Sequence, residues 1–337
     1  MSSHTVRSHA VHPSRTRRSR LLSAVLGAAT LCGITLSGGA QAADQLRIGA
    51  VLYARDSQFW QQIERGMKDA AAQYKVDIQF ALNRRQLPTE SQVVEDLVVR
   101  RVDALVVSPL DKDASAASIG RAKKEGIPVV EYNTFLADRL IASHTIGVDN
   151  KDLAAAVGKE IRRYVDGQLG GAASIGLITL PQINPGSAVR KNGMLSALEG
   201  TKLDIVADVS GATPEEGANG VENILRRNPN TQVIWASNSG TLAGAMAAAR
   251  RTGTKVKLYG VDMSREIAEE MLNPASSVEA VSDQQPYKVG FLAVEAAVKT
   301  KRGEQVPRDI TVPAKIYAKA DPAGVKDYIE LVKSLGQ

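Results

Sequence analysis

The side chains best suited to chemistry in this sequence stand at the ends of predicted strands. Six polar residues share that position, either following an apolar run or opening the next helix: Asn133, Thr134, Arg190, Asn238, Asp262 and Gln284. Because ligands of open α/β sheets lie at the carboxyl ends of the strands, these side chains are expected to face one crevice. Amides, a carboxylate and a guanidinium suit hydroxyl groups, which both donate and accept hydrogen bonds. Each residue alone also fits a helix cap or a turn.

Two adjacent aromatic residues, Phe59 and Trp60, end the loop between the predicted strand 46–52 and the predicted helix 59–74. At this edge of a sheet they can form a platform for the apolar face of a small ligand. The alternative is that both rings plug the top of the sheet.

Motifs of common enzyme classes are missing from the sequence. It has no phosphate-binding Gly-x-x-x-x-Gly-Lys-Ser/Thr loop, no Gly-x-Gly-x-x-Gly after the first strand, and no Gly-x-Ser-x-Gly. A Ser-His-Asp triad would need His144, which we interpret as a structural or surface residue. His144 is the only one of the four histidines that lies after residue 42, and one histidine cannot build a histidine-rich metal site. The prediction is a protein without catalytic residues, metal or cofactor, although acids that meet only in space remain an alternative.

The N-terminal 42 residues resemble an export signal. Five arginines precede the apolar stretch 21–36, and Ala40-Gln41-Ala42 is a small-x-small cleavage site. We therefore expect cleavage after Ala42 and a periplasmic location, by either the general or the twin-arginine route. Lipid attachment at Cys32 is disfavoured because Leu31 precedes it.

Removal of this segment changes the composition. Because five of the 42 basic residues and none of the 36 acidic residues precede Ala43, the remaining chain carries a net charge of +1. The basicity of the full chain therefore gives no support for nucleic-acid binding. The single cysteine is also removed, which suits an oxidising compartment in a protein without disulfides.

Strand-like and helix-like segments alternate after Ala43, which predicts parallel sheets flanked by helices. The expected strands are 46–52, 77–81, 104–108, 129–132, 174–179, 203–209, 233–236, 257–261 and 278–281. The expected helices are 59–74, 89–100, 114–124, 152–165, 188–198, 214–227, 241–251 and 266–271. The rhythm restarts after 146–149, so we predict two similar lobes.

Several motifs together resemble the periplasmic ribose/galactose-type sugar-binding proteins of ABC transporters, whose fold is shared with lactose-repressor-type ligand cores. The motifs are Phe59-Trp60-Gln-Gln-Ile-Glu-Arg-Gly66, Ala104-Leu-Val-Val-Ser-Pro109, Gly126-Ile-Pro-Val-Val130, Val189-Arg190-Lys-Asn-Gly193, Ser237-Asn238, Gly260-Val-Asp262 and Asp283-Gln284-Gln-Pro286. The resemblance covers residues 46 to about 332. It implies a type I periplasmic binding protein: two α/β lobes joined by three hinge crossings, with a sugar or polyol clamped between them and passed to a membrane permease.

The resemblance also implies residue roles. Phe59 and Trp60 stack on the sugar, Tyr53 and Ser57 add polar contacts, Arg190, Asn238 and Asp262 bind hydroxyls, and Gln284 lies at a hinge. The crossings are expected near 148–149, 283–284 and 311–313. The first lobe is then 43–148 plus 285–311, and the second is 149–283 plus 312–337.

Two departures from the ribose-type pattern point away from ribose itself. Asn133-Thr134 stands where those proteins carry an Asp-Arg pair, and Ala212 stands where they carry an aromatic residue nearby. A less charged, roomier pocket favours an unusual sugar, a polyol or a larger glycoside. Asp56-Ser-Gln-Phe-Trp60 and Ser282-Asp-Gln284 also resemble periplasmic sensors that bind trimethylamine N-oxide and engage a membrane histidine kinase. In that alternative, Trp60 would contact a cationic solute.

Overall fold

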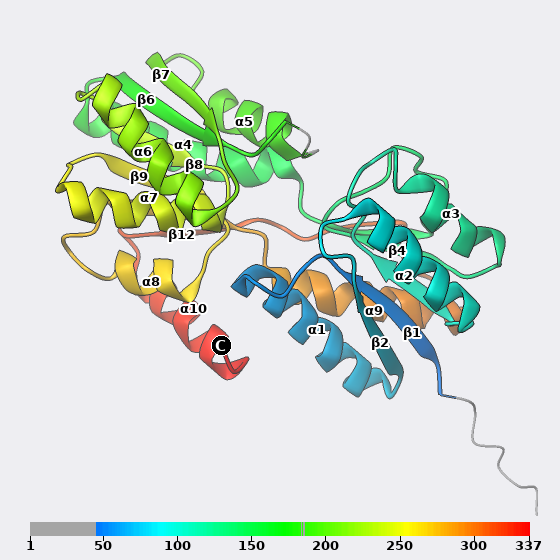
Figure 1. The fold of residues 1–337 in the computed structure, drawn as a ribbon. Coiled ribbons are helices and arrows are strands. Elements are labelled where there is room, and N and C mark those ends of the chain that lie inside the picture. The colour runs from blue at the N-terminus through cyan, green and yellow to red at the C-terminus, as the bar shows by residue number, and fades with distance from the viewer. Residues whose placement is uncertain (1–44, 183, 185) are drawn as a thin grey trace, which may run out of the picture. The chain divides into compact units, whose positions relative to one another are not determined.

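The computed structural model describes residues 45–182, 184 and 186–337, so the predicted signal segment and its cleavage site lie outside the described residues. Each of two lobes contains a six-stranded sheet (Figure 1). The first sheet has the order β11-β5-β4-β3-β1-β2 and is parallel throughout. Its strands are β1 (Arg47–Leu52), β2 (Asp77–Leu82), β3 (Ala104–Val107), β4 (Val129–Tyr132), β5 (His144–Gly147) and β11 (Asp309–Thr311). Its helices are α1 (Gln58–Tyr74), α2 (Leu87–Val99), α3 (Ala116–Lys124) and α9 (Pro286–Lys301).

The second sheet has the order β12-β10-β9-β8-β6-β7 and is parallel except for the antiparallel pair β10–β12. Its strands are β6 (Ala172–Thr179), β7 (Lys202–Ser210), β8 (Val233–Ala236), β9 (Lys257–Val261), β10 (Val278–Asp283) and β12 (Lys315–Ala318). Its helices are α4 (Asn150–Gln168), α5 (Gly186–Ser196), α6 (Pro214–Arg227), α7 (Ser239–Thr252), α8 (Arg265–Met271) and α10 (Pro322–Ser334). This arrangement confirms the predicted fold class.

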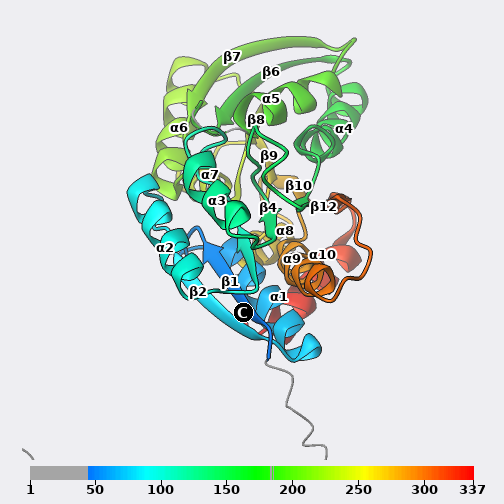
Figure 2. The same cartoon turned by 90° about the vertical axis from the view of Figure 1, so that its right-hand side faces the viewer.

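Helices cover both faces of each sheet because the central strands are apolar on both sides (Figure 2). In β1, Ala50 and Leu52 pack with Ile63 of α1, whereas Val51 packs with Leu97 of α2. In the second lobe, the strand side chains on one face of the sheet pack against α4, and those on the other face pack against α6 and α7.

Two glycines let α1 and α9 come together at backbone distance. A Cβ atom on Gly66 would lie 2.0 Å from the carbonyl oxygen of Tyr287, and one on Gly290 would lie 2.1 Å from that of Ile63. The two helices pack against each other beside the first sheet, so α1 has a fixed position relative to the sheet. Its N-terminus begins at Gln58, directly after the loop that follows β1.

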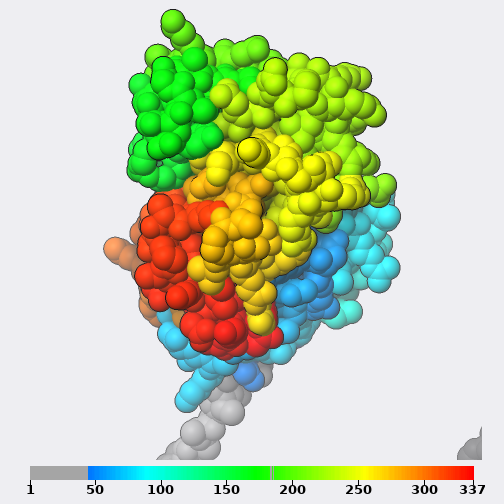
Figure 3. All heavy atoms as spheres, turned by 90° about the vertical axis from the view of Figure 1, so that its left-hand side faces the viewer, coloured from blue at the N-terminus to red at the C-terminus, as the bar shows by residue number. Residues whose placement is uncertain are grey.

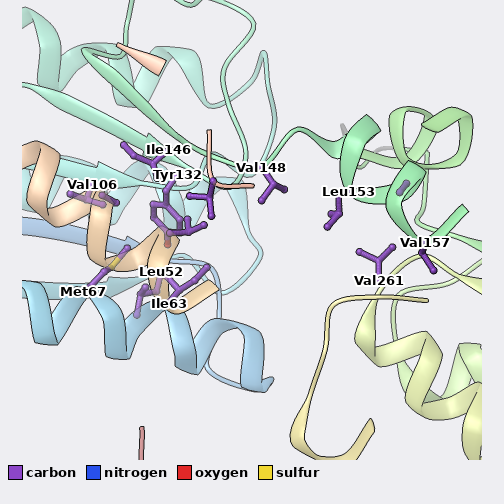
Figure 4. Close-up of a cluster of buried hydrophobic side chains, with 14 of the residues drawn as sticks. Leu52, Ile63, Met67, Val106, Tyr132, Ile146, Val148, Leu153, Val157 and Val261 are labelled. Atoms are coloured by element: carbon purple, nitrogen blue, oxygen red, sulfur yellow. The ribbon is translucent and has the colours of Figure 1, made fainter. Parts of the chain in front are cut away.

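The chain passes between the two sheets three times: from β5 to α4, from β10 to α9, and from β11 to β12. Val148 lies on the first of these crossings, and its side chain is buried. Figure 4 shows it between apolar residues of the first lobe, such as Tyr132, and Leu153 and Val261 of the second. The core therefore continues along a crossing from one lobe to the other.

Residues after Pro286, for which the sequence pattern predicts no individual element, form α9, β11, β12 and α10. His144 begins β5, where its Nδ1–H donates to the Pro307 carbonyl (2.9 Å) and its Nε2 contacts the Thr300 hydroxyl (2.8 Å). It therefore fastens β5 to the end of α9. Among the described residues, no helix combines the length and apolar character needed to span a membrane.

Candidate functional site

The aromatic residues predicted as a platform form a connected stack on the first lobe. The rings of Tyr53 and Trp60 are parallel within 12° with centroids 4.9 Å apart, and Phe59 meets Trp60 edge-on at 5.0 Å. The Arg85 guanidinium lies 5.4 Å from the centroid of the Tyr53 ring and pairs with Asp56 at 2.6 Å. Phe59 and Trp60 are half-buried and pack against the core from the first turn of α1. The two predictions for this pair therefore describe one arrangement, in which the rings partly cover the sheet and also present aromatic surface.

Three polar residues predicted for the first lobe lie at the ends of neighbouring elements. Ser57 occupies the N-cap position of α1, but its side chain makes no capping hydrogen bond. Asn133 follows β4 with a positive φ of 62°, and its amide is 3.5 Å from the Ser108 hydroxyl. Thr134 shares its hydroxyl between Ser108 (2.8 Å) and the Pro109 carbonyl (2.6 Å). Thr134 is therefore held by the loop after β3, which leaves Ser57 and Asn133 with more capacity for a ligand.

A buried acid lies two residues before Asn133 in β4. Glu131 is fully buried, and its Oε2 accepts the Leu136 N–H at 3.2 Å. Its Oε1 has no hydrogen-bond partner within the described part of the chain. Burial raises the pKa of Glu131 to about 7, and the Arg139 charge offsets only part of this effect. Glu131 therefore anchors the loop that starts at Asn133.

The second lobe brings its predicted residues together in one buried network. Arg190, which is 7% exposed, donates from Nε to Asn150 Oδ1 (2.7 Å) and from Nη1 to the Ser237 carbonyl (2.9 Å). Nη1 is also 3.5 Å from Oδ2 of Asp262. The other carboxylate oxygen of Asp262 accepts from Gln284 Nε2 at 2.5 Å. This chain of contacts links a guanidinium, a carboxylate and an amide from three elements.

Asn238 adds an amide group beside this network. Its Oδ1 caps α7 by accepting the Thr241 N–H at 3.0 Å, so the alternative prediction of a helix cap holds for this residue. Its Nδ2 is buried and lacks a hydrogen-bond partner among residues 45–182, 184 and 186–337, and so does the neighbouring Ser237 hydroxyl. An unpaired buried donor is costly, so a ligand that accepts from Asn238 would be favoured.

Gln284 lies on the crossing from β10 to α9, beside a buried acid. Asp283 accepts the Met263 N–H (3.1 Å) and the Gln285 N–H (2.9 Å), and Gln285 adopts a positive φ of 54°. Burial, with a smaller contribution from the nearby Asp262, raises the pKa of Asp283 to about 7. The crossing therefore has a defined conformation, fixed by hydrogen bonds to the end of β9.

Helix α1 also contacts the second lobe directly, on the face shown in Figure 3. Three hydrogen bonds make this contact: Arg265 N–H to Gln58 Oε1 (2.6 Å), Gln62 Nε2 to the Tyr328 hydroxyl (3.1 Å), and Arg65 Nη1 to the Leu335 carbonyl (3.1 Å). These bonds join the first lobe to α8 and α10.

The structure thus gathers the predicted residues into two groups, the platform with Ser57 and Asn133 on one lobe and the Arg190 network on the other. Within the part of the chain that the structure describes, no hydrogen bond, ion pair or ring stack joins the two groups. Sequence reasoning missed two members, Asn150 and Arg85. Asn150 follows β5, so the strand-end rule applied there would have found it. Among the described residues, no three His, Cys, Asp or Glu side chains gather as a metal site.

Comparison with known proteins identifies the family of this chain. Residues 48–305 match the family described as periplasmic binding protein domain. The ABC transporter periplasmic-binding protein YphF of Escherichia coli K12 is 29% identical over 323 residues, covering 92% of this chain and 95% of YphF. The ribose import binding protein RbsB of Bacillus subtilis 168 is 25% identical over 81% of this chain and 87% of its own length.

A solved structure shares the fold. The ABC transporter periplasmic solute binding protein from Actinobacillus succinogenes 130z, with bound D-allose, has a TM-score of 0.77 at 23% identity, covering 83% of this chain and all of that one. The chain belongs to the periplasmic binding protein domain family. It is a solute-binding protein with the type I periplasmic binding protein fold, and not an enzyme. The predicted resemblance is confirmed.

Proposed function

We propose that this protein binds a sugar or polyol between its two lobes and delivers it to the membrane permease of an ABC-type importer. The observation that carries the proposal is the buried network of Arg190, Asp262 and Gln284. A guanidinium, a carboxylate and an amide at one strand edge offer both donors and acceptors, which is what a polyhydroxylated ligand requires. The relatives named for ribose import and the fold relative with bound D-allose support the same ligand class.

The first lobe contributes the apolar part of the site. One ring of the Tyr53–Trp60–Phe59 stack packs against the C–H face of the ligand, while Ser57 and Asn133 bond to its hydroxyls. No charged pair stands at Asn133-Thr134, so fewer charge-assisted bonds are available there than in ribose-type proteins. The ligand is therefore a polyol, a larger glycoside or a sugar other than ribose.

Binding closes the lobes about the three crossings, in the hinge manner of binding proteins. The lobes comprise 43–148 plus 285–311 and 149–283 plus 312–337. The closed form docks on the permease through surfaces of both lobes. The exported protein begins at Ala43, and mass spectrometry of the periplasmic protein would test that N-terminus.

Intrinsic fluorescence provides a direct test of ligand binding. The chain has two tryptophans: Trp60 in the platform and Trp235, which is fully buried in β8. A Trp235→Phe variant leaves Trp60 as the only reporter, and titration with D-allose, D-arabinose or myo-inositol should change its emission saturably. A matched Trp60→Phe variant should lose most of that change. Equal responses in both variants would contradict the placement of the ligand at the platform.

A further inference from the structure

The Arg190 side chain is held by Asn150, a residue that has no assigned contact with the ligand. Its Nε–H donates to Asn150 Oδ1 at 2.7 Å, and its Nη1 is directed to the Ser237 carbonyl and toward Asp262. Nη2 has no hydrogen-bond partner among the described residues. Within the described part of the chain, protein acceptors thus engage Nε and Nη1 but not the two N–H groups of Nη2.

Local structure places Asn150 firmly. It is the first residue of α4, directly after the crossing from β5, and the preceding Asp149 caps the helix by accepting the N–H groups of Lys151 (2.7 Å) and Asp152 (3.1 Å). The backbone position of Asn150 is therefore fixed by a helix start rather than by a mobile loop.

The approach of α5 to α4 brings Arg190 within reach of this helix start. Gly193, one turn after Arg190, faces the first turn of α4, where a Cβ atom would lie 2.5 Å from the Lys151 carbonyl oxygen. A second glycine, Gly158, makes the matching contact on α4, where a Cβ would lie 2.6 Å from the Met194 carbonyl oxygen. The two helix backbones therefore come into direct contact, and the Arg190 side chain reaches Asn150 at the start of α4.

We propose that Asn150 is a positioning residue that fixes the plane of the Arg190 guanidinium before ligand arrives, so that Nη2 stays directed at the ligand. Its role in affinity rests on the proposed function, whereas its hold on Arg190 does not. Arginine has many rotamers, and ordering it in advance removes that cost from binding. Because Nε–H belongs to arginine and not to lysine, the effect depends on Arg190 specifically.

A double-mutant cycle tests the effect on affinity, with D-allose and myo-inositol as the calorimetric probes. Asn150→Leu should weaken binding about 10-fold or more, as expected for a lost hydrogen bond to a charged group. The same change in an Arg190→Lys background should alter binding by less than about twofold, since the coupled donor is already missing. Asn150→Asp should restore most of the affinity, because a carboxylate accepts the same Nε–H. Asn219→Leu, at an exposed position of α6, is the matched control and should leave affinity unchanged.

A ligand-free measurement separates this inference from the proposed function. In the NMR spectrum, the Arg190 Nε–H, assigned by its loss in Arg190→Lys, should be ordered and slow to exchange, and Asn150→Leu should make it mobile. Asn150→Ser, whose side chain is too short to reach Nε, should give the same result if Asn150→Leu folds poorly. An unchanged Nε–H signal in these variants, or additive losses of affinity in the cycle, would overturn the inference. An ordered Nε–H that depends on Asn150, in a protein that binds no sugar or polyol, would instead support the positioning role and contradict the proposed ligand class.

Discussion

Replacing Arg190 by alanine is predicted to weaken ligand binding more than any other single change in the second lobe. Arg190 is 7% exposed, and no other cation lies within ion-pair distance of Asp262 among the described residues. A charge-assisted hydrogen bond to a ligand hydroxyl contributes about 1.5–3 kcal/mol, and the loss of the cation beside Asp262 adds to that. The expected cost is about 2–4 kcal/mol of binding free energy, which corresponds to roughly 30- to 800-fold in Kd.

Calorimetric titration of the variant with its best sugar or polyol measures this cost. Arg227→Ala, at an exposed position near the end of α6, is the control and should bind like the wild type. The Arg190→Ala protein should also have a lower free energy of unfolding, by about 1–3 kcal/mol, because the Ser237 carbonyl and Asp262 lose a buried partner. Wild-type affinity in a folded Arg190→Ala protein would refute the assignment of Arg190 to the site.

Three further predictions concern the platform, the buried acid and the helix pair. Trp60→Ala should weaken binding by about 1–2 kcal/mol through lost stacking, whereas Trp60→Phe should retain most of the affinity; equal losses would argue against stacking. Glu131 keeps its proton in the folded protein up to about pH 7, whereas its ordinary pKa is 4.5, so the folded state binds more protons between these values and stability falls as pH rises through them. In chemical denaturation, Glu131→Gln should reduce this fall in the free energy of unfolding by up to about 3 kcal/mol. The exposed Glu125→Gln is the control and should not change it. Identical dependence of stability on pH in the wild type and Glu131→Gln would show that Glu131 is ionised. Gly66→Ala should lower the free energy of unfolding by about 1–3 kcal/mol or more, since its Cβ meets the α9 backbone; an unchanged melting temperature would contradict this packing.

Apart from β5, the strands and helices up to residue 283 could be predicted because their apolar residues form short runs in strands and stripes at helical spacing in helices. β1 is a short apolar run that is buried on both faces after its first residue, and α1 has a buried stripe at helical spacing that includes Ile63 and Met67. The strand-end rule likewise led to Arg190 and Asp262, because parallel strands bring their carboxyl ends to one edge.

Contacts between residues far apart in the sequence could not be predicted from these patterns. Gln62 meets the Tyr328 hydroxyl across 266 positions, and nothing in either local sequence indicates that contact. Arg85 reaches the Tyr53 ring from the loop after β2, where it adopts a positive φ of 59° that the sequence gives no reason to expect at an arginine. The short strands β11 and β12 have few buried residues, so their apolar periodicity is weak.

Under the proposed function, we expect the identity of the ligand to depend on the first lobe more than on the second. In the proposed site, the Arg190 network would offer hydrogen bonds that suit many sugars, whereas the platform and the uncharged pair Asn133-Thr134 would select for ligand size and polarity. The Arg85–Asp56 ion pair at the outer end of the stack is at least half exposed and therefore contributes little to stability. We therefore expect differences in affinity among sugars to depend chiefly on contacts with Tyr53, Trp60 and Asn133, and not on this ion pair.

The central claim is that the protein beginning at Ala43 binds a sugar or polyol without chemical change. A thermal-unfolding screen against sugars, polyols and methylamines tests it most directly. A ligand at about 100 times its Kd stabilises the folded state by about 2.7 kcal/mol, so its melting temperature should rise clearly for at least one sugar or polyol. A shift with trimethylamine N-oxide alone would favour the sensor alternative, and no shift with any compound in the panel would contradict the solute-binding account.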